Sequence, residues 1–226
     1  MPAAQLGGKP ALPDDTAWPE WEGSLNFVAS IDCDRLPPNT LDIALPDSGT
    51  LLLFYFDDEA GYHDPLYVPP TVGSWNPDSA TGARVLHVPS GAPERDTPLD
   101  IQPYEYVPLT AKPTFTGPDW SHPAFREACR DVSDADQAFL ADHANGDAFV
   151  SALRRLTPSP RHQLGGHSVP IQDAAETAHT TLLAQFDSDS EADMRWGDLG
   201  TLFWMIPPTD LAAGDFTTTS FTWQCT

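Results

Sequence analysis

Basic side chains are scarce in this sequence. Its 226 residues include only 11 Lys and Arg against 33 Asp and Glu, and the formal net charge is −22. Phosphate backbones and anionic lipid headgroups are bound through clusters of basic side chains. The composition therefore argues against nucleic acid and membrane surfaces as partners. The acidic excess is either a solubility device or a surface that attracts a basic partner protein.

Long apolar runs and paired cysteines are also missing. The longest apolar run, 51–56, is far shorter than the roughly 20 residues that span a bilayer. The first residues lack the basic start and apolar stretch of a secretory signal. Cys33, Cys129 and Cys225 are odd in number and far apart, which argues against a disulfide framework. We expect a cytoplasmic protein with free thiols.

Sequence motifs that are typical of catalytic or metal-binding sites are absent as well. The chain has no HEXXH, no CXXC pair, no complete Walker loop and no GXSXG. We therefore expect no cofactor. The absence favours a non-catalytic protein, although it does not decide against an enzyme.

The residues that are present predict a β-rich α+β protein with mostly antiparallel sheets. With 24 Pro and 15 Gly, strands and loops are favoured over a helical bundle. Alternating or wholly apolar stretches predict strands at 25–32, 49–56, 84–88, 101–109, 179–187, 200–206 and 221–225. The block 118–155 has helical spacing, with Ser133 and Asp136 resembling a capping box. Residues 209–213 predict one more helical turn, capped by Thr209 and stopped by Gly214.

The tetrapeptide QLGG occurs at 5–8 and again at 163–166. Each copy is followed by an apolar strand ending in Asp (Asp32, Asp187) and then by a Gly-Thr-Leu entry into a second strand. This shared order predicts an internal duplication, with independently evolved turns as the alternative. We expect one domain over 1–226, with similar halves at about 1–117 and 156–226 and a helical insert at about 118–155.

Two neighbouring stretches before residue 200 are open to a functional and a structural interpretation. Asp187, Asp189, Glu191, Asp193 and Asp198 follow the spacing of a calcium loop, but Ala192 stands where such a loop needs Gly. A solvated loop whose Asp side chains cap turns accounts for the same acidic residues, so the sequence does not decide whether a metal binds here. Trp196-Gly197-Asp198 forms either a packed turn or one wall of a ligand or partner pocket.

Several segments resemble those of the YwqG-like bacterial proteins, a domain of unknown function. They are KPALPDDTAWPEWEGSLNFVASIDCDRLP and GTLLLFYF in the first half, and HQLGGHSVPIQ, LLAQFDSD, WGDLGTLFWMI, DLAAGDF and TWQC in the second. The resemblance spans nearly the whole chain. It implies a single compact α+β protein, and the association of some relatives with toxin and immunity loci implies a protein that binds another protein.

Two functional hypotheses follow. The first is a non-catalytic protein-binding protein of the immunity kind that engages a basic partner protein. The alternative is a metal-dependent or small-ligand-binding enzyme or sensor with its site between the two halves, where clefts commonly form. The candidate binding residues are Asp32, Gly165, Gly166, Asp187, Trp196, Gly197 and Asp198.

Overall fold

The computed structural model describes residues 2–57, 72, 77–157 and 159–226. It confirms an α+β protein with two antiparallel sheets, which are separated in sequence by a helical block. In the described part of the chain, the first sheet has the strand order β4-β3-β2-β1-β5 and the second has the order β6-β7-β8-β9. The strands of the first sheet are β1 (Ala4–Leu6), β2 (Asn26–Asp32), β3 (Thr50–Tyr55), β4 (Ala83–Val88) and β5 (Val107–Leu109). Those of the second are β6 (His162–Leu164), β7 (Thr181–Asp187), β8 (Thr201–Ile206) and β9 (Ser220–Gln224).

The two sheets share one hydrophobic core. Tyr55 of β3 stacks on Phe221 of β9, with 5.1 Å between the ring centroids, and meets Trp196 edge-on. Trp204 in the centre of β8 is fully buried. On the far side of the first sheet, Trp18 packs edge-on against Phe54, as the apolar area of a Trp in a polar loop predicts. The apolar residues 51–55 of β3 are all buried, as expected of a strand covered on both faces.

The hydrogen-bonding register of the two sheets is the same. In each sheet, the strand that ends in Asp places that Asp opposite a Thr of the next strand. The pairing of each of these strands also shifts register at one point, immediately before an Ala of that strand. The matching positions are Asp32 with Thr50 and Asp187 with Thr201 for the pairs, and Ala29 and Ala184 for the irregularities. A bulge at one matching place is a feature that related sheets retain. We propose on this basis that the two halves derive from a duplication.

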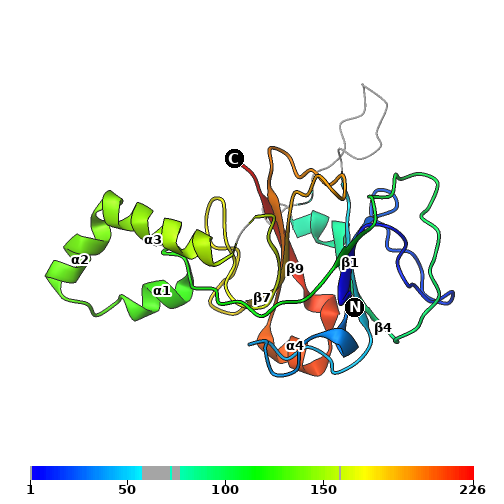
Figure 1. Cartoon of the computed structure of the whole chain (residues 1–226), viewed down its shortest axis with the longest axis horizontal. Helices are drawn as coiled ribbons and strands as arrows, with labels where there is room; N and C mark the ends of the chain where they lie inside the picture. The colour runs from blue at the N-terminus through cyan, green and yellow to red at the C-terminus, as the bar shows by residue number, and fades with distance from the viewer. Residues whose placement is uncertain (1, 58–71, 73–76, 158) are drawn as a thin grey trace.

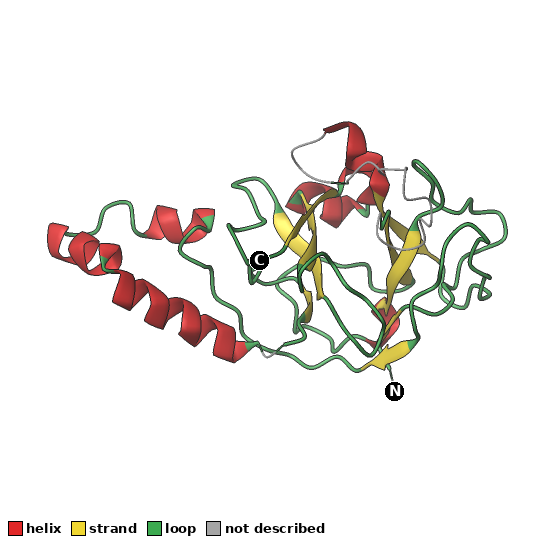
Figure 2. Ribbon diagram, turned by 90° about the horizontal axis from the view of Figure 1, so that it is seen from above, coloured by secondary structure: helices red, strands yellow, loops and turns green. Residues whose placement is uncertain are grey.

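Helices α1 (Pro123–Ala128), α2 (Asp134–Ala141) and α3 (His143–Leu156) form an arm that projects from the sheets along the longest axis of the molecule (Figure 1). Seen from above, α3 runs along the arm towards the sheets (Figure 2). Ser133 caps α2 as predicted: its Oγ accepts from the Asp136 N–H and donates to the Asp136 carboxylate. No residue of α1 or α2 is buried, and the single buried residue of α3 is Gly146, which has no side chain to pack. The arm therefore has little core of its own.

The structure corrects two predictions, one about a helix cap and one about the length of a strand. In α4 (Pro208–Ala213), Pro207 occupies the N-cap and no side chain caps the helix, so Thr209 as the cap was wrong. Pro at the first helical position needs no N–H partner there. Gly214 ends α4 in the left-handed conformation as predicted. The strand expected at 101–109 is restricted to β5. The short 3-10 helices are η1 (Cys33–Arg35), η2 (Pro77–Gly82) and η3 (Phe216–Thr218).

None of the helices in the described part of the chain combines the length and hydrophobicity needed to cross a bilayer.

Candidate binding cleft between the sheets

A cleft of about 750 Å³ opens between the two sheets, at the end where β1 and β6 lie. Its floor consists of apolar side chains from both sheets, including Ile31 of β2 and Phe186 of β7. All three residues of β6 line it. The remaining wall comes from the loop after η1, the segment after β5 and the connection from α3 to β6: residues 36–37, 40–42, 110–116, 156–157 and 160–161. Its volume falls in the usual range of small-molecule sites, roughly 300–1,000 Å³.

The second Gly-Gly turn forms part of the cleft wall. Gly165 and Gly166 both have positive φ, as do Gly7 and Gly8 in the first copy. The Gln163 side chain closes the turn by donating to the Gly165 and His167 carbonyls, at 2.8 and 2.9 Å. Gln5 makes the same two bonds, to Gly7 and Lys9. The repeated Gln therefore braces a turn that needs Gly at both following positions.

The environments of the two turns differ. The Gly166 N–H donates to the Asp42 carboxylate at 2.8 Å, and the His167 N–H donates to Thr116 Oγ1 at 2.9 Å. These bonds tie the second turn to two segments of the first half. A Cβ added at Gly7 would overlap the backbone oxygen of Glu105, whereas one at Gly165 would meet the Asp42 side chain. The first turn is thus packed against backbone, while the second borders the cleft.

The charge in the cleft is opposite to that of the chain. Acidic residues outnumber Lys and Arg by 33 to 11 overall, but the described lining contains Lys112 and Arg161 and only one carboxylate, Asp42. His162 and His167 line the cleft too. Arg161 is partly neutralised by Asp187 at 3.3 Å, whereas Lys112 has no ion pair among the described residues. The described lining therefore carries more positive than negative formal charge, and an anion in the cleft would be attracted rather than repelled by it.

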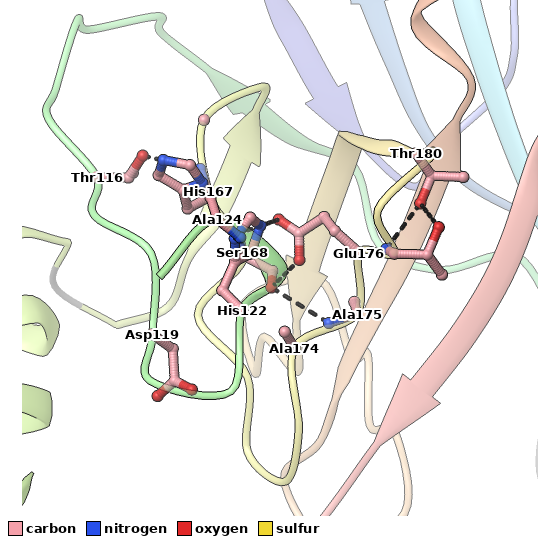
Figure 3. Close-up of polar contacts among 12 residues, drawn as sticks. Thr116, Asp119, His122, Ala124, His167, Ser168, Ala174, Ala175, Glu176 and Thr180 are labelled. Atoms are coloured by element: carbon pink, nitrogen blue, oxygen red, sulfur yellow. Dashed lines mark hydrogen bonds and ion pairs between the residues drawn. The ribbon is translucent and has the colours of Figure 1, made fainter. Parts of the chain in front are cut away.

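A polar cluster, most of it buried, adjoins the second Gly-Gly turn (Figure 3), and one of its members, His167, lines the cleft. Glu176 is 5% exposed, and its carboxylate accepts from the Ser168 N–H at 2.7 Å and from Ser168 Oγ at 2.5 Å. Nε2 of His122 lies 3.7 Å from the same carboxylate, and the rings of His122 and His167 meet edge-on. These bonds fix the chain immediately after the second Gly-Gly turn, because a buried carboxylate needs its partners.

His122, His167 and Glu176 are the one group of metal-ligating side chains that converges among the described residues, with ligand atoms within 4.8 Å of one another. The hydrogen bonding of His122 does not fit a metal. Its Nδ1 accepts from the Ala124 N–H at 3.1 Å, where it caps α1. In a neutral imidazole the proton then resides on Nε2, whose lone pair a metal would need. Burial, together with His167, lowers the pKa of His122 and keeps the ring neutral near pH 7, although Glu176 and Asp119 act in the opposite direction.

The same cluster lacks the geometry of nucleophilic catalysis. Ser168 Oγ is bonded to the Glu176 carboxylate and not to an imidazole. Ser168 and Glu176 are 3% and 5% exposed, so a substrate has no access to either. A nucleophile needs both a positioned base and access to its substrate. The cluster is a structural support in this arrangement.

Asp32 and Asp187 occupy equivalent places but have different surroundings, and neither lines the cleft. Asp32 caps η1 by accepting from the Asp34 N–H and pairs with Arg35 at 2.8 Å. The Asp187 carboxylate is buried and accepts from Thr201 Oγ1 at 2.7 Å and from the Arg161 N–H at 2.8 Å. Asp187 therefore acts on the cleft indirectly, by holding Arg161.

The remaining candidates lie elsewhere. The carboxylates of 187–198 do not converge as calcium ligands would; Asp189 accepts from His162 at 3.0 Å and from the Glu191 N–H at 2.8 Å. Trp196 is 2% exposed and packs edge-on against Tyr104, and Gly197 adopts a positive φ beside Trp223. The exposed Asp198 contacts Thr226. None of the three residues Trp196, Gly197 and Asp198 lines the cleft.

Sequence reasoning found Gly165 and Gly166 but missed Lys112, Arg161 and the partners His122 and Glu176. The scarcity of Lys was a usable signal, since one of only two lysines lies at the cleft. No local pattern marks His122 and Glu176, which are far apart in the chain and have no ligand spacing.

Comparison with known proteins places the chain in a family. A family model described as a domain of unknown function, DUF1963, matches residues 4–225, so the chain belongs to that family. Among curated proteins, none matches the chain.

Proposed function

We propose that this DUF1963 protein is a non-catalytic binding protein whose ligand occupies the cleft between the two sheets and carries negative charge. The observation that carries the proposal is the reversal of charge in the cleft: Lys112 and Arg161 line it with a single carboxylate, that of Asp42, in a chain of net charge −22. Partly exposed apolar lining residues such as Leu109 and Leu164 would take the uncharged part of the ligand. An apolar cavity with a few convergent polar groups is the usual form of a ligand site.

The test uses an anionic aromatic probe, 8-anilinonaphthalene-1-sulfonate, whose fluorescence rises in apolar surroundings. We expect saturable binding to one site on the folded protein. Lys112→Glu removes one attraction and adds one repulsion of about 1 kcal/mol each at 4 Å in water, which weakens binding roughly 30-fold. The matched control is Lys9→Glu, which changes the other lysine; Lys9 pairs with Asp96 and lies outside the cleft. We expect Lys9→Glu to bind as the unaltered protein does.

Near-ultraviolet circular dichroism verifies that the variants remain folded. Binding that does not saturate, or equal binding by the two lysine variants, would contradict the proposal. Raising the salt concentration is expected to weaken binding, because salt screens exposed charges.

A second candidate function is binding of a basic protein through the helical arm, in line with the immunity-type role that the YwqG-like resemblance implies. The observation that favours it is Phe139 on α2, which is 61% exposed. The tip of the arm around it is acidic, with Asp131, Asp134, Asp136 and Asp142. An exposed aromatic side chain among acidic residues matches a basic partner with an apolar contact at its centre.

Affinity capture from the source cells tests this candidate. Phe139→Ser is expected to lose the captured basic protein. Leu99→Ser is expected to retain it, because Leu99 is also an exposed apolar residue but lies outside the arm. Both substitutions are at exposed positions and leave stability nearly unchanged. The same captured proteins with all three baits would exclude the arm as the binding surface.

A further inference from the structure

The matching halves differ at one sheet edge. In the first sheet, β5 pairs antiparallel with the outer edge of β1, placing Leu109 opposite Ala4 and Val107 opposite Leu6. In the second sheet, β6 is the counterpart of β1 but ends the sheet; the described residues provide no strand on its outer side. The cleft lies along this edge, since every residue of β6 lines it. The second half therefore has an open place where the first half holds a strand.

The register of β6 shows which backbone groups face that place. The Asp187 N–H donates to the Arg161 carbonyl at 3.0 Å, and the Gly165 N–H donates to the Leu183 carbonyl at 3.2 Å. In antiparallel pairing these bonds flank Gln163, whose N–H and C=O face Gln185 of β7. The N–H and C=O groups of His162 and Leu164 consequently point away from β7. An exposed edge of this kind is a template for another strand.

We propose that the cleft binds a short extended peptide that adds an antiparallel strand to β6 and places a carboxylate near Lys112. The proposal rests on the proposed function and names the class of its ligand. Main-chain bonds to His162 and Leu164 supply the recognition, as in other cases of strand addition, and the apolar floor takes alternate side chains. Lys112 selects a peptide with an acidic side chain or a free carboxyl terminus.

Strand β5 shows what such a peptide needs. Val107 and Leu109 face the outward groups of β1, while Pro108 stands opposite Gln5, at the position whose N–H would point away. A proline is compatible with an edge strand at that position. Only alternate residues of the ligand therefore need an N–H. The similarity of β1 (AQL) and β6 (HQL) makes β5 itself a suitable template for a probe.

The experiment measures fluorescence anisotropy of a labelled nine-residue peptide with the sequence of residues 103–111, PYEYVPLTA, and a free carboxyl terminus. The control peptide is methylated on the backbone nitrogens that correspond to Val107 and Leu109, which removes the donors and keeps every side chain. We expect saturable binding of the first peptide and at least tenfold weaker binding of the second. Equal binding of the two peptides would overturn strand addition.

A matched pair of protein variants tests the same edge. Leu164→Pro removes the outward N–H, and Leu164→Ala keeps it while shortening the side chain. We expect Leu164→Pro to bind the peptide at least tenfold more weakly than Leu164→Ala, with both variants verified as folded by circular dichroism. Should Leu164→Pro fail to fold, the methylated peptide alone decides.

The outcomes separate this proposal from the one on which it rests. If the anilinonaphthalene sulfonate probe binds in a Lys112-dependent manner and the peptide does not bind at millimolar concentration, the peptide is excluded and the anion-binding cleft stands. If neither binds, both proposals fail. A concentration-dependent dimer in sedimentation that Leu164→Pro abolishes would show that a second copy of β6 occupies the edge, and would overturn the peptide proposal.

Discussion

Asp32 and Asp187 stand at matching places in the two sheets, which allows the cost of losing each carboxylate to be compared directly. Replacing Asp187 by Ala leaves the Thr201 hydroxyl, which is 2% exposed, and the Arg161 N–H without their acceptor. It also leaves the Arg161 guanidinium, 18% exposed, without its ion-pair partner. An unsatisfied buried group costs about 1–3 kcal/mol, and breaking a buried ion pair costs roughly 3–5 kcal/mol. We expect Asp187→Ala to lower the free energy of unfolding by about 3–5 kcal/mol.

The same change at Asp32 removes a cap of a 3-10 helix and an exposed pair with Arg35. Loss of a cap costs about 1 kcal/mol and loss of an exposed pair at most about 1 kcal/mol, so we expect a loss of roughly 1–2 kcal/mol. Urea unfolding followed by Trp fluorescence measures both, and equal slopes with denaturant are needed for the comparison. Asp187→Asn, which keeps one acceptor for Thr201, should fall between them. If the two Ala variants agree within about 0.5 kcal/mol, the structural role assigned to the Asp187 carboxylate is wrong.

Three further outcomes are expected. Gly7→Ala should lower the melting temperature more than Gly165→Ala, because both positions have positive φ but only at Gly7 would the new methyl group overlap backbone; equal shifts would contradict this. Burial raises the pKa of the Cys33 thiol to about 11, with Asp32 also contributing, so iodoacetamide at pH 8 should label Cys33 only after denaturation, as mass spectrometry will show. The lowered pKa of His122 means that the unfolded chain binds its proton first, so stability should fall as the pH drops below about 6.5. His122→Asn, which retains a cap for α1, should reduce this dependence, and an unchanged pH profile would exclude His122 as its source.

Much of the fold follows from local patterns in the sequence. The apolar run of β3 and the alternation in β2 predict strands because these side chains must be buried on one or both faces. Ser133 predicts the start of α2 because a hydroxyl before a helix satisfies a free N–H. The short strands β1 and β6 escaped prediction, since three residues are too few to display a period.

The candidate site was only partly accessible from the sequence. Gly165 and Gly166 stand out because a Gly-Gly turn repeated in order signals a backbone requirement. Lys112 and Arg161 come together only because the segment after β5 and the connection from α3 to β6 meet at one cleft. Trp196 has a distinctive sequence context, yet the structure places it in the core.

The sequence by itself determined which segments form strands and helices, that similar segments occur in the same order in two halves of the chain, and that positive charge is rare. These properties depend on residues close together in the chain, or on composition. The tertiary structure decided which positive charges line the cleft, which carboxylate of a matching pair is buried, and which sheet edge stays open. Those properties depend on which segments distant in the chain meet, and in particular on β5 covering β1 while the cleft borders β6.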